Sequence, residues 1–242
     1  MWTAERIEKL VPYLRRYARA ATGDTATGDA CVERVLQTVI DLSLEASFEE
    51  TDFDRERLFK MLDQELDKLS SSQAAKSRRA LLLIAVENLP QAMVRRIFGV
   101  SEQELEKMLV IAEADLTSFT ATRLLIIEDE PLISSQLKRL AESLGHQVIG
   151  IAITADEAVT LCQGQQPDLV LSDINLADGS QGTDAIAQMQ LPDNVPVVYV
   201  TAYPEKYLST TNEGPSYLIT KPFDPEYLKA VIGHALINVQ SA

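Results

Sequence analysis

Apolar residues in the first half of the chain recur at helical spacing, and no stretch up to residue 70 alternates with the two-residue period of a strand. Positions three and four apart lie on one face of a helix, so this pattern predicts amphipathic helices. A break near residues 22–24 and a polar segment at 43–54 separate three of them. Their apolar faces are Ile7, Leu10, Val11, Leu14 and Ala18; Val32, Val35, Leu36, Val39 and Ile40; and Leu58, Phe59, Leu62, Leu66 and Leu69.

Shorter helical segments follow. Residues 70–75 are either a linker or the start of a helix, and residues 80–86 are apolar on all sides, as in a helix buried within a bundle. A further short helix ends at Gly99, after which Ser101 and Glu104 form the capping box of another helix. This succession predicts a helix-turn-helix.

The second helix of a helix-turn-helix normally enters the major groove of DNA with its first residues against base edges. Here those residues are Glu102, Gln103, Glu104 and Glu106. Carboxylates close to DNA phosphates oppose binding. The motif therefore has the shape of a DNA reader without the charge that reading needs.

The pattern changes in the second half to short apolar runs that end on polar residues. Unbroken runs of this length suit strands buried on both faces of a parallel sheet. Segments with helical patterning separate them, which predicts an α/β domain. The four runs cover residues 123–130, 168–175, 195–201 and 217–223.

Functional groups stand where these predicted strands end: Glu128, Asp129, Asp173, Thr201 and Lys221. The carboxyl ends of parallel strands meet at one edge of a sheet, where α/β proteins bind ligands. A single strand-ending Asp is usually a helix cap or a turn former. Three carboxylates, a hydroxyl and an ammonium group arriving from four strands instead predict a site.

The order and spacing of these residues resemble those of a response-regulator receiver domain over residues 124–242. The resemblance implies a (βα)5 flavodoxin-like fold. It also implies that Asp173 accepts a phosphoryl group from a sensor histidine kinase or phosphotransferase, assisted by Thr201 and Lys221. We expect no enzymatic activity beyond formation of the aspartyl phosphate and its hydrolysis.

A divalent cation would relieve the repulsion among the carboxylates at this edge. Mg²⁺ prefers carboxylate and carbonyl oxygens, which suits Asp129, Asp173 and the backbone carbonyl of Asn175, with Glu128 binding directly or through water. Glu128 departs from the receiver pattern, in which Asp is more usual. Leu218 departs as well, because many receivers carry an aromatic switch residue at that position.

The alternative for this half is a nucleotide-binding or degenerate receiver-like domain in which the acids are caps. No glycine-rich phosphate loop follows the first predicted strand, because Glu130, Pro131 and Leu132 stand there. Pro131 suits the first turn of a helix instead.

The helical part resembles an extracytoplasmic-function sigma factor, although a plain helical bundle would show similar patterns. Residues 1–69 resemble sigma region 2 and residues 70–120 resemble region 4 with its helix-turn-helix. A receiver at residues 121–242 after such a part is the arrangement of PhyR-type general stress response regulators. The overall expectation is an all-helical sigma-like domain followed by an α/β receiver domain.

That family implies a partner-switching mechanism. The unphosphorylated receiver would pack on the sigma-like helices and cover their binding surface. Phosphorylation of Asp173 would free them to sequester a NepR-type anti-sigma factor, which would release the true sigma factor. Two alternatives remain: a response regulator that binds DNA directly, and a phosphate relay whose helices serve as a docking or dimerisation module.

Composition and charge narrow these choices. The net charge is −14 and both halves are acidic, which argues against DNA as the main partner. Arg15, Arg16 and Arg19 form a local basic group that we expect to be a solvated helix face. Without a run of roughly 18 apolar residues or a signal-peptide core, we expect a cytoplasmic protein that does not bind membranes. Cys31 and Cys162 are expected to be reduced, buried thiols.

Overall fold

The computed structural model describes residues 3–44, 54–116, 121–192, 194–203 and 217–240. These residues fall into two compact units, of which the first ends at Asp115 and the second begins at Leu116. Residues 45–53 of the predicted polar segment lie outside the described part.

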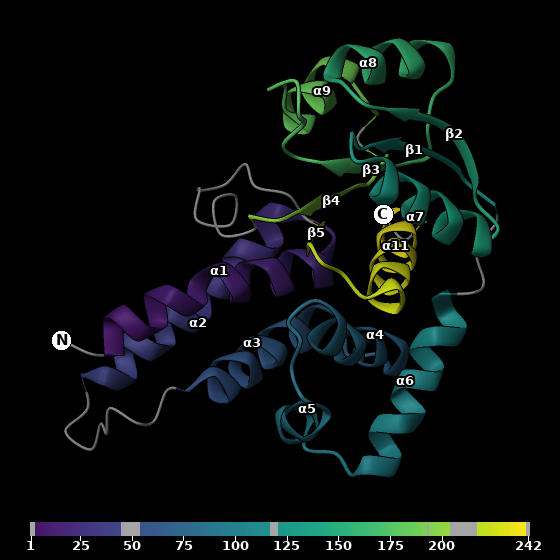
Figure 1. The fold of residues 1–242 in the computed structure, drawn as a ribbon. Coiled ribbons are helices and arrows are strands. Elements are labelled where there is room, and N and C mark those ends of the chain that lie inside the picture. Colours follow the sequence, from purple (N-terminus) through teal and green to yellow (C-terminus); the bar gives the residue numbers. More distant parts are fainter. Residues whose placement is uncertain (1–2, 45–53, 117–120, 193, 204–216, 241–242) are drawn as a thin grey trace. The chain divides into compact units, whose positions relative to one another are not determined.

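The described part of the first unit is helical, as predicted (Figure 1). Side-chain caps define several helix ends, because Asp24 accepts from the Thr27 amide and Ser72 accepts from the Ala75 amide. Ser72 therefore starts a helix within residues 70–75. The helices are α1 (Thr3–Thr22), α2 (Thr25–Ser43), α3 (Arg55–Leu69), α4 (Gln73–Ala85), α5 (Gln91–Phe98) and α6 (Glu102–Leu116).

Close packing joins the first three helices. Gly28 of α2 lies against the backbone of α1, so that an added Cβ would stand 2.7 Å from the Arg19 nitrogen. The rings of Tyr17 and Phe59 meet edge to face with centroids 5.7 Å apart. Both side chains are fully buried, as is Cys31, whose thiol is free as expected.

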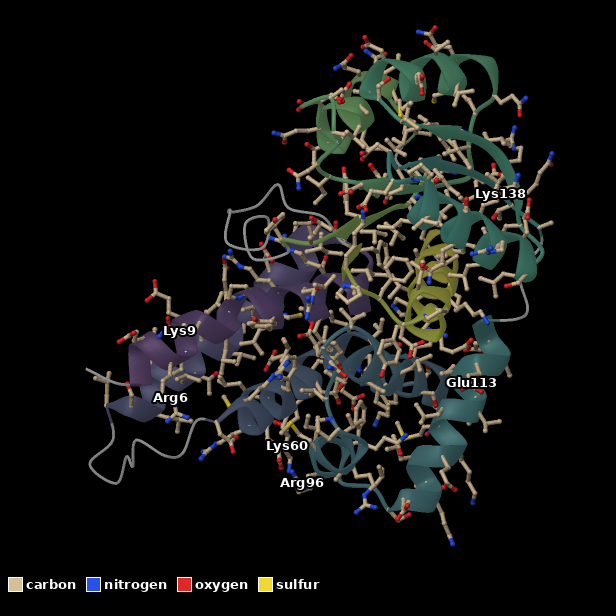
Figure 2. The ribbon with its side chains drawn as sticks, viewed as in Figure 1. Arg6, Lys9, Lys60, Arg96, Glu113 and Lys138 are labelled. Carbon is tan, nitrogen blue, oxygen red and sulfur yellow. The ribbon has the colours of Figure 1, made fainter. Side chains whose placement is uncertain are left out.

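The expectation that Arg15, Arg16 and Arg19 form a solvated face is wrong. The Arg19 side chain is fully buried and makes two 2.8 Å hydrogen bonds to Asp29 of α2. Arg16 is buried against a second carboxylate, and Arg15 lies 3.8 Å from Asp29. Buried arginines of this kind need paired acids, and these come from other elements. The exposed cations of α1 are Arg6 and Lys9 (Figure 2).

The second unit is built on a five-stranded parallel sheet with the strand order β2-β1-β3-β4-β5. This is the flavodoxin-like order, and it confirms the predicted receiver fold. The central strand β3 and its neighbour β1 are almost wholly buried, as their unbroken apolar runs predicted. The strands are β1 (Arg123–Ile127), β2 (Gln147–Ala152), β3 (Leu169–Asp173), β4 (Val197–Thr201) and β5 (Tyr217–Thr220).

Helices cover both faces of the sheet (Figure 1). Two of them, α7 (Pro131–Ser143) and α11 (Pro225–Gln240), pack on one face, whereas α8 (Ala155–Gly164) and α9 (Gly182–Met189) pack on the other. Cys162 of α8 is a free, buried thiol in the apolar core beneath the second face. The sheet thus holds the carboxyl ends of β1, β3, β4 and β5 rigidly at one edge.

Candidate functional site

Asp173 and Glu128 lie at the carboxyl ends of two adjacent strands, β3 and β1. Asp173 is the last residue of β3 and is 7% exposed, and Glu128 directly follows β1 and is fully buried. The Glu128 amide donates to the Ala152 carbonyl at 2.9 Å, which fixes the chain where β1 ends. The packed sheet therefore holds two carboxylates in a place with little solvent.

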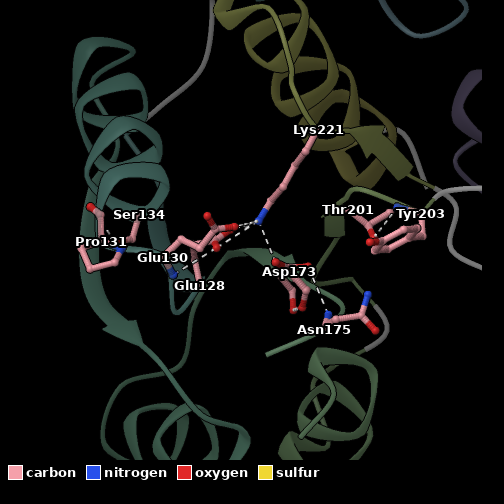
Figure 3. Close-up of polar contacts among 10 residues, drawn as sticks. Glu128, Glu130, Pro131, Ser134, Asp173, Asn175, Thr201, Tyr203 and Lys221 are labelled. Carbon is pink, nitrogen blue, oxygen red and sulfur yellow. Dashed lines mark hydrogen bonds and ion pairs between the residues drawn. The ribbon is translucent and has the colours of Figure 1, made fainter. Parts of the chain in front are cut away.

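Lys221 joins the carboxylates of this edge (Figure 3). Its Nζ lies 2.6 Å from Asp173 Oδ2, 2.8 Å from Glu128 Oε2 and 3.4 Å from Glu130 Oε1. Burial lowers the pKa of Lys221, but the Asp173 and Glu128 carboxylates outweigh it and the net shift is upward. Lys221 is therefore a protonated ammonium that neutralises part of the acidic group.

Glu128 is the most strongly perturbed carboxyl group of this edge. Burial, opposed by the hydrogen bond from Lys221 and reinforced by the charge of Asp173, raises its pKa to about 7. Glu128 Oε1 accepts from Lys221 and from the Glu130 amide. Glu128 Oε2 is buried and lies 2.8 Å from the Lys221 ammonium. The ammonium therefore contacts both oxygens of this carboxylate.

The loop after β3 is shaped around Asp173. The Asn175 amide donates to Asp173 Oδ1 at 3.1 Å, and the Ser172 hydroxyl donates to the Asp173 carbonyl at 2.8 Å. Gly182, the first residue of α9, donates its amide to the Ile174 carbonyl at 2.9 Å. These bonds set the direction of the Asp173 carboxylate.

Thr201 ends β4 and is fully buried. Its hydroxyl accepts from the Tyr203 amide at 3.2 Å, and its carbonyl accepts from the Lys221 amide at 2.8 Å. The second bond ties the end of β4 to the residue that carries the ammonium group. Thr201 is therefore joined to the Lys221 backbone.

The three carboxylates that the structure brings together are those of Glu128, Glu130 and Asp173, whose oxygens lie within 4.8 Å of one another. Asp129, which the sequence assigned to the metal, is half-buried and is not a member of this group. Glu130 was missed, and the only signal for it was its place in the acidic run that follows β1.

The residues near Lys221 fit a hard cation such as Mg²⁺. They offer only oxygen donors, the carboxylates of Glu128, Glu130 and Asp173. Receiver domains typically bind Mg²⁺ through acidic residues of this kind, and the acidic group agrees with that behaviour.

The aromatic switch expected of many receivers is replaced by an aliphatic residue. Leu218 is 2% exposed within β5, and the preceding Tyr217 packs its ring against His234 of α11 with centroids 6.5 Å apart. Tyr203, close to Thr201, is 67% exposed.

The raised pKa of Glu128 predicts a pH-dependent stability in the absence of Mg²⁺. A carboxyl group with a folded-state pKa of about 7 and an ordinary value of 4.5 binds its proton more tightly when folded. Stability from this group is therefore present at low pH and is lost as pH rises from about 4.5 to about 7. The receiver should lose about 2 kcal/mol more between about pH 5 and about pH 8 than Glu128→Gln does.

Chemical denaturation of the two proteins in a chelator, repeated with Mg²⁺, would measure this difference. Saturating Mg²⁺ should reduce it, and Glu142→Gln on the exposed side of α7 should behave like the unmodified protein. Parallel stability curves for the unmodified and Glu128→Gln proteins in the chelator would contradict the prediction.

The predicted capping box of the helical unit is also present. The Ser101 amide and hydroxyl donate to Glu104 Oε2 at 2.8 and 2.7 Å, and the Glu104 amide donates back to the Ser101 hydroxyl at 3.3 Å. Gly99, with φ of 67°, ends α5. The helix-turn-helix is therefore formed, and its second helix begins with exposed carboxylates at Glu102 and Glu104.

Comparisons with known proteins agree with both halves of the molecule. The family model of the response regulator receiver domain matches residues 124–233, and that of the Sigma2 domain of PhyR matches residues 7–63. The phyllosphere-induced regulator PhyR of Methylorubrum extorquens is 38% identical over 261 aligned residues, which cover 100% of this chain and 97% of that protein.

Solved structures are similar over the same length. The crystal structure of a double mutant of the anti-anti-sigma factor PhyR from Bartonella quintana has a TM-score of 0.89 at 38% identity, and covers 99% of this chain and 100% of that one. The response regulator PhyR from Brucella abortus has a TM-score of 0.88 at 38% identity, covering 100% and 96%. Among the helices that the structure describes, none combines the length and apolarity needed to cross a bilayer.

Proposed function

Because this chain belongs to the PhyR family of response regulators, we propose that it acts as an anti-anti-sigma factor controlled by phosphorylation of Asp173. The observation that carries this proposal is the group formed by Asp173, Lys221 and Glu128, with the ammonium 2.6 and 2.8 Å from the two carboxylates. Such a group is built to neutralise charge around a phosphoryl acceptor.

The phosphoryl group comes from a phosphohistidine of a sensor kinase or phosphotransferase. An Asp173 oxygen attacks the phosphorus, an O–P bond forms as the P–N bond breaks, and the imidazole leaves with the electron pair of that bond. Lys221 then exchanges its contact with Asp173 for one with a phosphoryl oxygen. The Thr201 hydroxyl provides a further hydrogen bond, and hydrolysis of the O–P bond resets the protein.

Mg²⁺, when bound, neutralises negative charge on the phosphoryl oxygens. Glu128, Asp129, Asp173 and the Asn175 carbonyl are the groups that would hold it, and Glu130 adds a carboxylate within reach. The carboxylate oxygens of Glu128, Glu130 and Asp173, which lie within 4.8 Å of one another, support a cation site here.

The output of the switch is the helical unit. We take residues 1–69 as the counterpart of sigma region 2, which the match of the PhyR Sigma2 model to residues 7–63 supports, and residues 70–120 as the counterpart of region 4. In the unphosphorylated protein the receiver prevents these helices from binding an anti-sigma factor of the NepR type, and phosphorylation removes this inhibition. The sigma factor held by that protein is then released in the cytoplasm, where transcription occurs.

Capture of a NepR-type anti-sigma factor with and without acetyl phosphate tests the function. The unmodified protein should bind at least about tenfold more tightly after phosphorylation, a difference of about 1.4 kcal/mol. Asp173→Asn should bind at the unphosphorylated level in both conditions, because the amide cannot accept the phosphoryl group. The matched control is Asp156→Asn, which changes an exposed Asp in the first turn of α8.

Equal capture of the anti-sigma factor by phosphorylated and unphosphorylated protein would refute control by Asp173. Rapid return of the phosphoryl group to a phosphotransferase, without any capture, would favour a phosphate relay. Retention on promoter DNA with a steep salt dependence would favour a DNA-binding regulator. The exposed acids at the start of α6 predict that no such retention occurs.

A further inference from the structure

A buried carboxylate lies in the turn between α4 and α5. The Glu87 side chain is fully buried, and its two oxygens accept hydrogen bonds from Nε and a terminal nitrogen of Arg16 at 2.8 and 3.0 Å. Arg16 belongs to α1 and is itself only 7% exposed at the side chain. This is a bidentate arginine–carboxylate pair, which is the strongest geometry for such a pair.

The same turn is held by its backbone. Arg16 donates a further hydrogen bond to the Val86 carbonyl at 2.9 Å, and Arg55, at the start of α3, donates to the Glu87 carbonyl at 2.9 Å. Arg55 also lies 3.7 Å from a Glu87 carboxylate oxygen. Both guanidinium groups stack on the Tyr13 ring, at 5.4 and 5.5 Å from its centroid. Arginines from α1 and α3 therefore both bind the turn between α4 and α5.

An exposed ion pair between the same parts provides a contrast. Glu56 of α3 and Arg96 of α5 are joined by hydrogen bonds of 2.8 and 3.0 Å, but the Arg96 side chain is 58% exposed (Figure 2). Water competes for such a pair, so its loss changes little. Loss of the Glu87 charge instead leaves Arg16 buried without its carboxylate, which is strongly unfavourable.

The helical unit consists of two helical groups, α1–α3 and α4–α6. Their relative placement shapes a hollow of about 680 Å³. One wall comes from α3 and includes Lys60 and Gln64, and the other comes from the α5–α6 region and includes Val100, Met108 and Ile111. A change in the angle between α1–α3 and α4–α6 would deform this hollow. Its shape therefore depends on what fixes the two groups to each other.

We propose that Arg16 and Glu87 are positioning residues that hold α1–α3 and α4–α6 as one body, so that the anti-sigma factor meets a two-part surface in a fixed geometry. This inference rests on the proposed function. The link between the two groups, Ser70 and Ser71, is short and exposed, so side-chain contacts such as Arg16–Glu87 and the buried pair of Arg79 of α4 with Asp63 of α3, 2.7 Å apart, set their orientation. Fixing them before binding reduces the entropy that binding has to remove.

Pulsed electron–electron double resonance on the full-length protein tests whether the two helical groups keep a fixed geometry. Spin labels at Lys60→Cys of α3 and Val110→Cys of α6, with Cys31 and Cys162 changed to Ala, report the distance between the two groups. Glu87→Gln should broaden the distance distribution, whereas Arg96→Gln should leave it narrow. Arg16→Lys keeps the charge but cannot form the bidentate pair, and it serves as the second variant if Glu87→Gln does not fold.

Anti-sigma binding is then measured on unlabelled, phosphorylated protein. Glu87→Gln or Arg16→Lys should weaken binding by at least about tenfold, while the rate of Asp173 phosphorylation stays unchanged because the receiver is not altered. Arg96→Gln should bind as the unmodified protein does. A purely structural role would lower the melting temperature without changing the affinity of the folded protein.

A narrow distance distribution and unchanged affinity in Glu87→Gln would overturn the proposal, as would an equal effect of Arg96→Gln. If the unmodified, phosphorylated protein fails to bind any anti-sigma factor, the proposed function fails. The distance measurement still decides in that case whether Arg16 and Glu87 fix the two groups.

Discussion

Gly182→Ala is expected to reduce phosphoryl transfer to Asp173 by at least about tenfold and to destabilise the receiver by about 1–3 kcal/mol. A Cβ at this position would lie 1.9 Å from the Asp173 carbonyl oxygen and 2.3 Å from the Ser172 hydroxyl. The nearest of these atoms is backbone, which cannot rotate away. The start of α9 or the end of β3 must therefore move, and Asp173 moves with it.

Phosphorylation kinetics with acetyl phosphate and chemical denaturation would measure the two effects. Gly164→Ala is the matched control, because a Cβ on this residue at the end of α8 meets nothing within 4 Å. That variant should keep the phosphorylation rate and change stability by no more than about 1 kcal/mol, in the stabilising direction. A Gly182→Ala protein with unchanged kinetics would show that the acceptor loop does not depend on this contact.

Asp29→Ala is expected to destabilise the helical unit by about 3–5 kcal/mol. The variant removes both hydrogen bonds to the Arg19 guanidinium, which is fully buried between α1 and α2. A buried charge without a partner is far more costly than the loss of an exposed pair. The receiver should still accept a phosphoryl group, because the two residues lie in the other unit.

Denaturation followed by the helical signal, alongside phosphorylation of the same samples, would separate the two units. The control is Glu5→Ala, which removes the exposed pair of Glu5 with Lys9 on the same helix, and it should cost no more than about 0.5 kcal/mol. Equal destabilisation by the two variants would contradict the importance assigned to burial.

The ends of buried strands could be read from the sequence because an apolar run stops where the sheet stops. That is why Asp173 and Lys221, 48 residues apart, were both assigned to one edge, and the structure places their charged atoms 2.6 Å apart. Their roles in phosphoryl transfer remain a proposal. Strand β2 was not located from its own residues, because most of them are half-buried at the edge of the sheet.

Residues beyond a strand end were harder to predict. The sequence places Asp129 and Glu130 side by side after β1, but the turn into α7 decides which carboxylate approaches Lys221. Glu130 is the N-cap residue of α7, directly before Pro131, and it is Glu130 that lies 3.4 Å from the ammonium. Apolar periodicity carries no information on such a turn.

Long-range ion pairs were hidden for a related reason. Helical spacing shows which face of α1 carries Arg16, but its partner Glu87 is 71 residues away. An arginine next to apolar positions is exposed if no carboxylate lies opposite and buried if one does. Whether Arg16 is exposed or buried is therefore decided by the packing of α1 against the turn after α4.

The capping box of α6 has a consequence for how the helical unit meets nucleic acid. A DNA-reading helix of this kind offers the amide groups near its start to a phosphate of the double helix. Here the Glu104 carboxylate already accepts from the Ser101 amide at 2.8 Å. The Glu104 carboxylate thus occupies the position that a DNA phosphate would take. To make this motif bind a promoter, Glu104 would have to be replaced before any basic side chain is added.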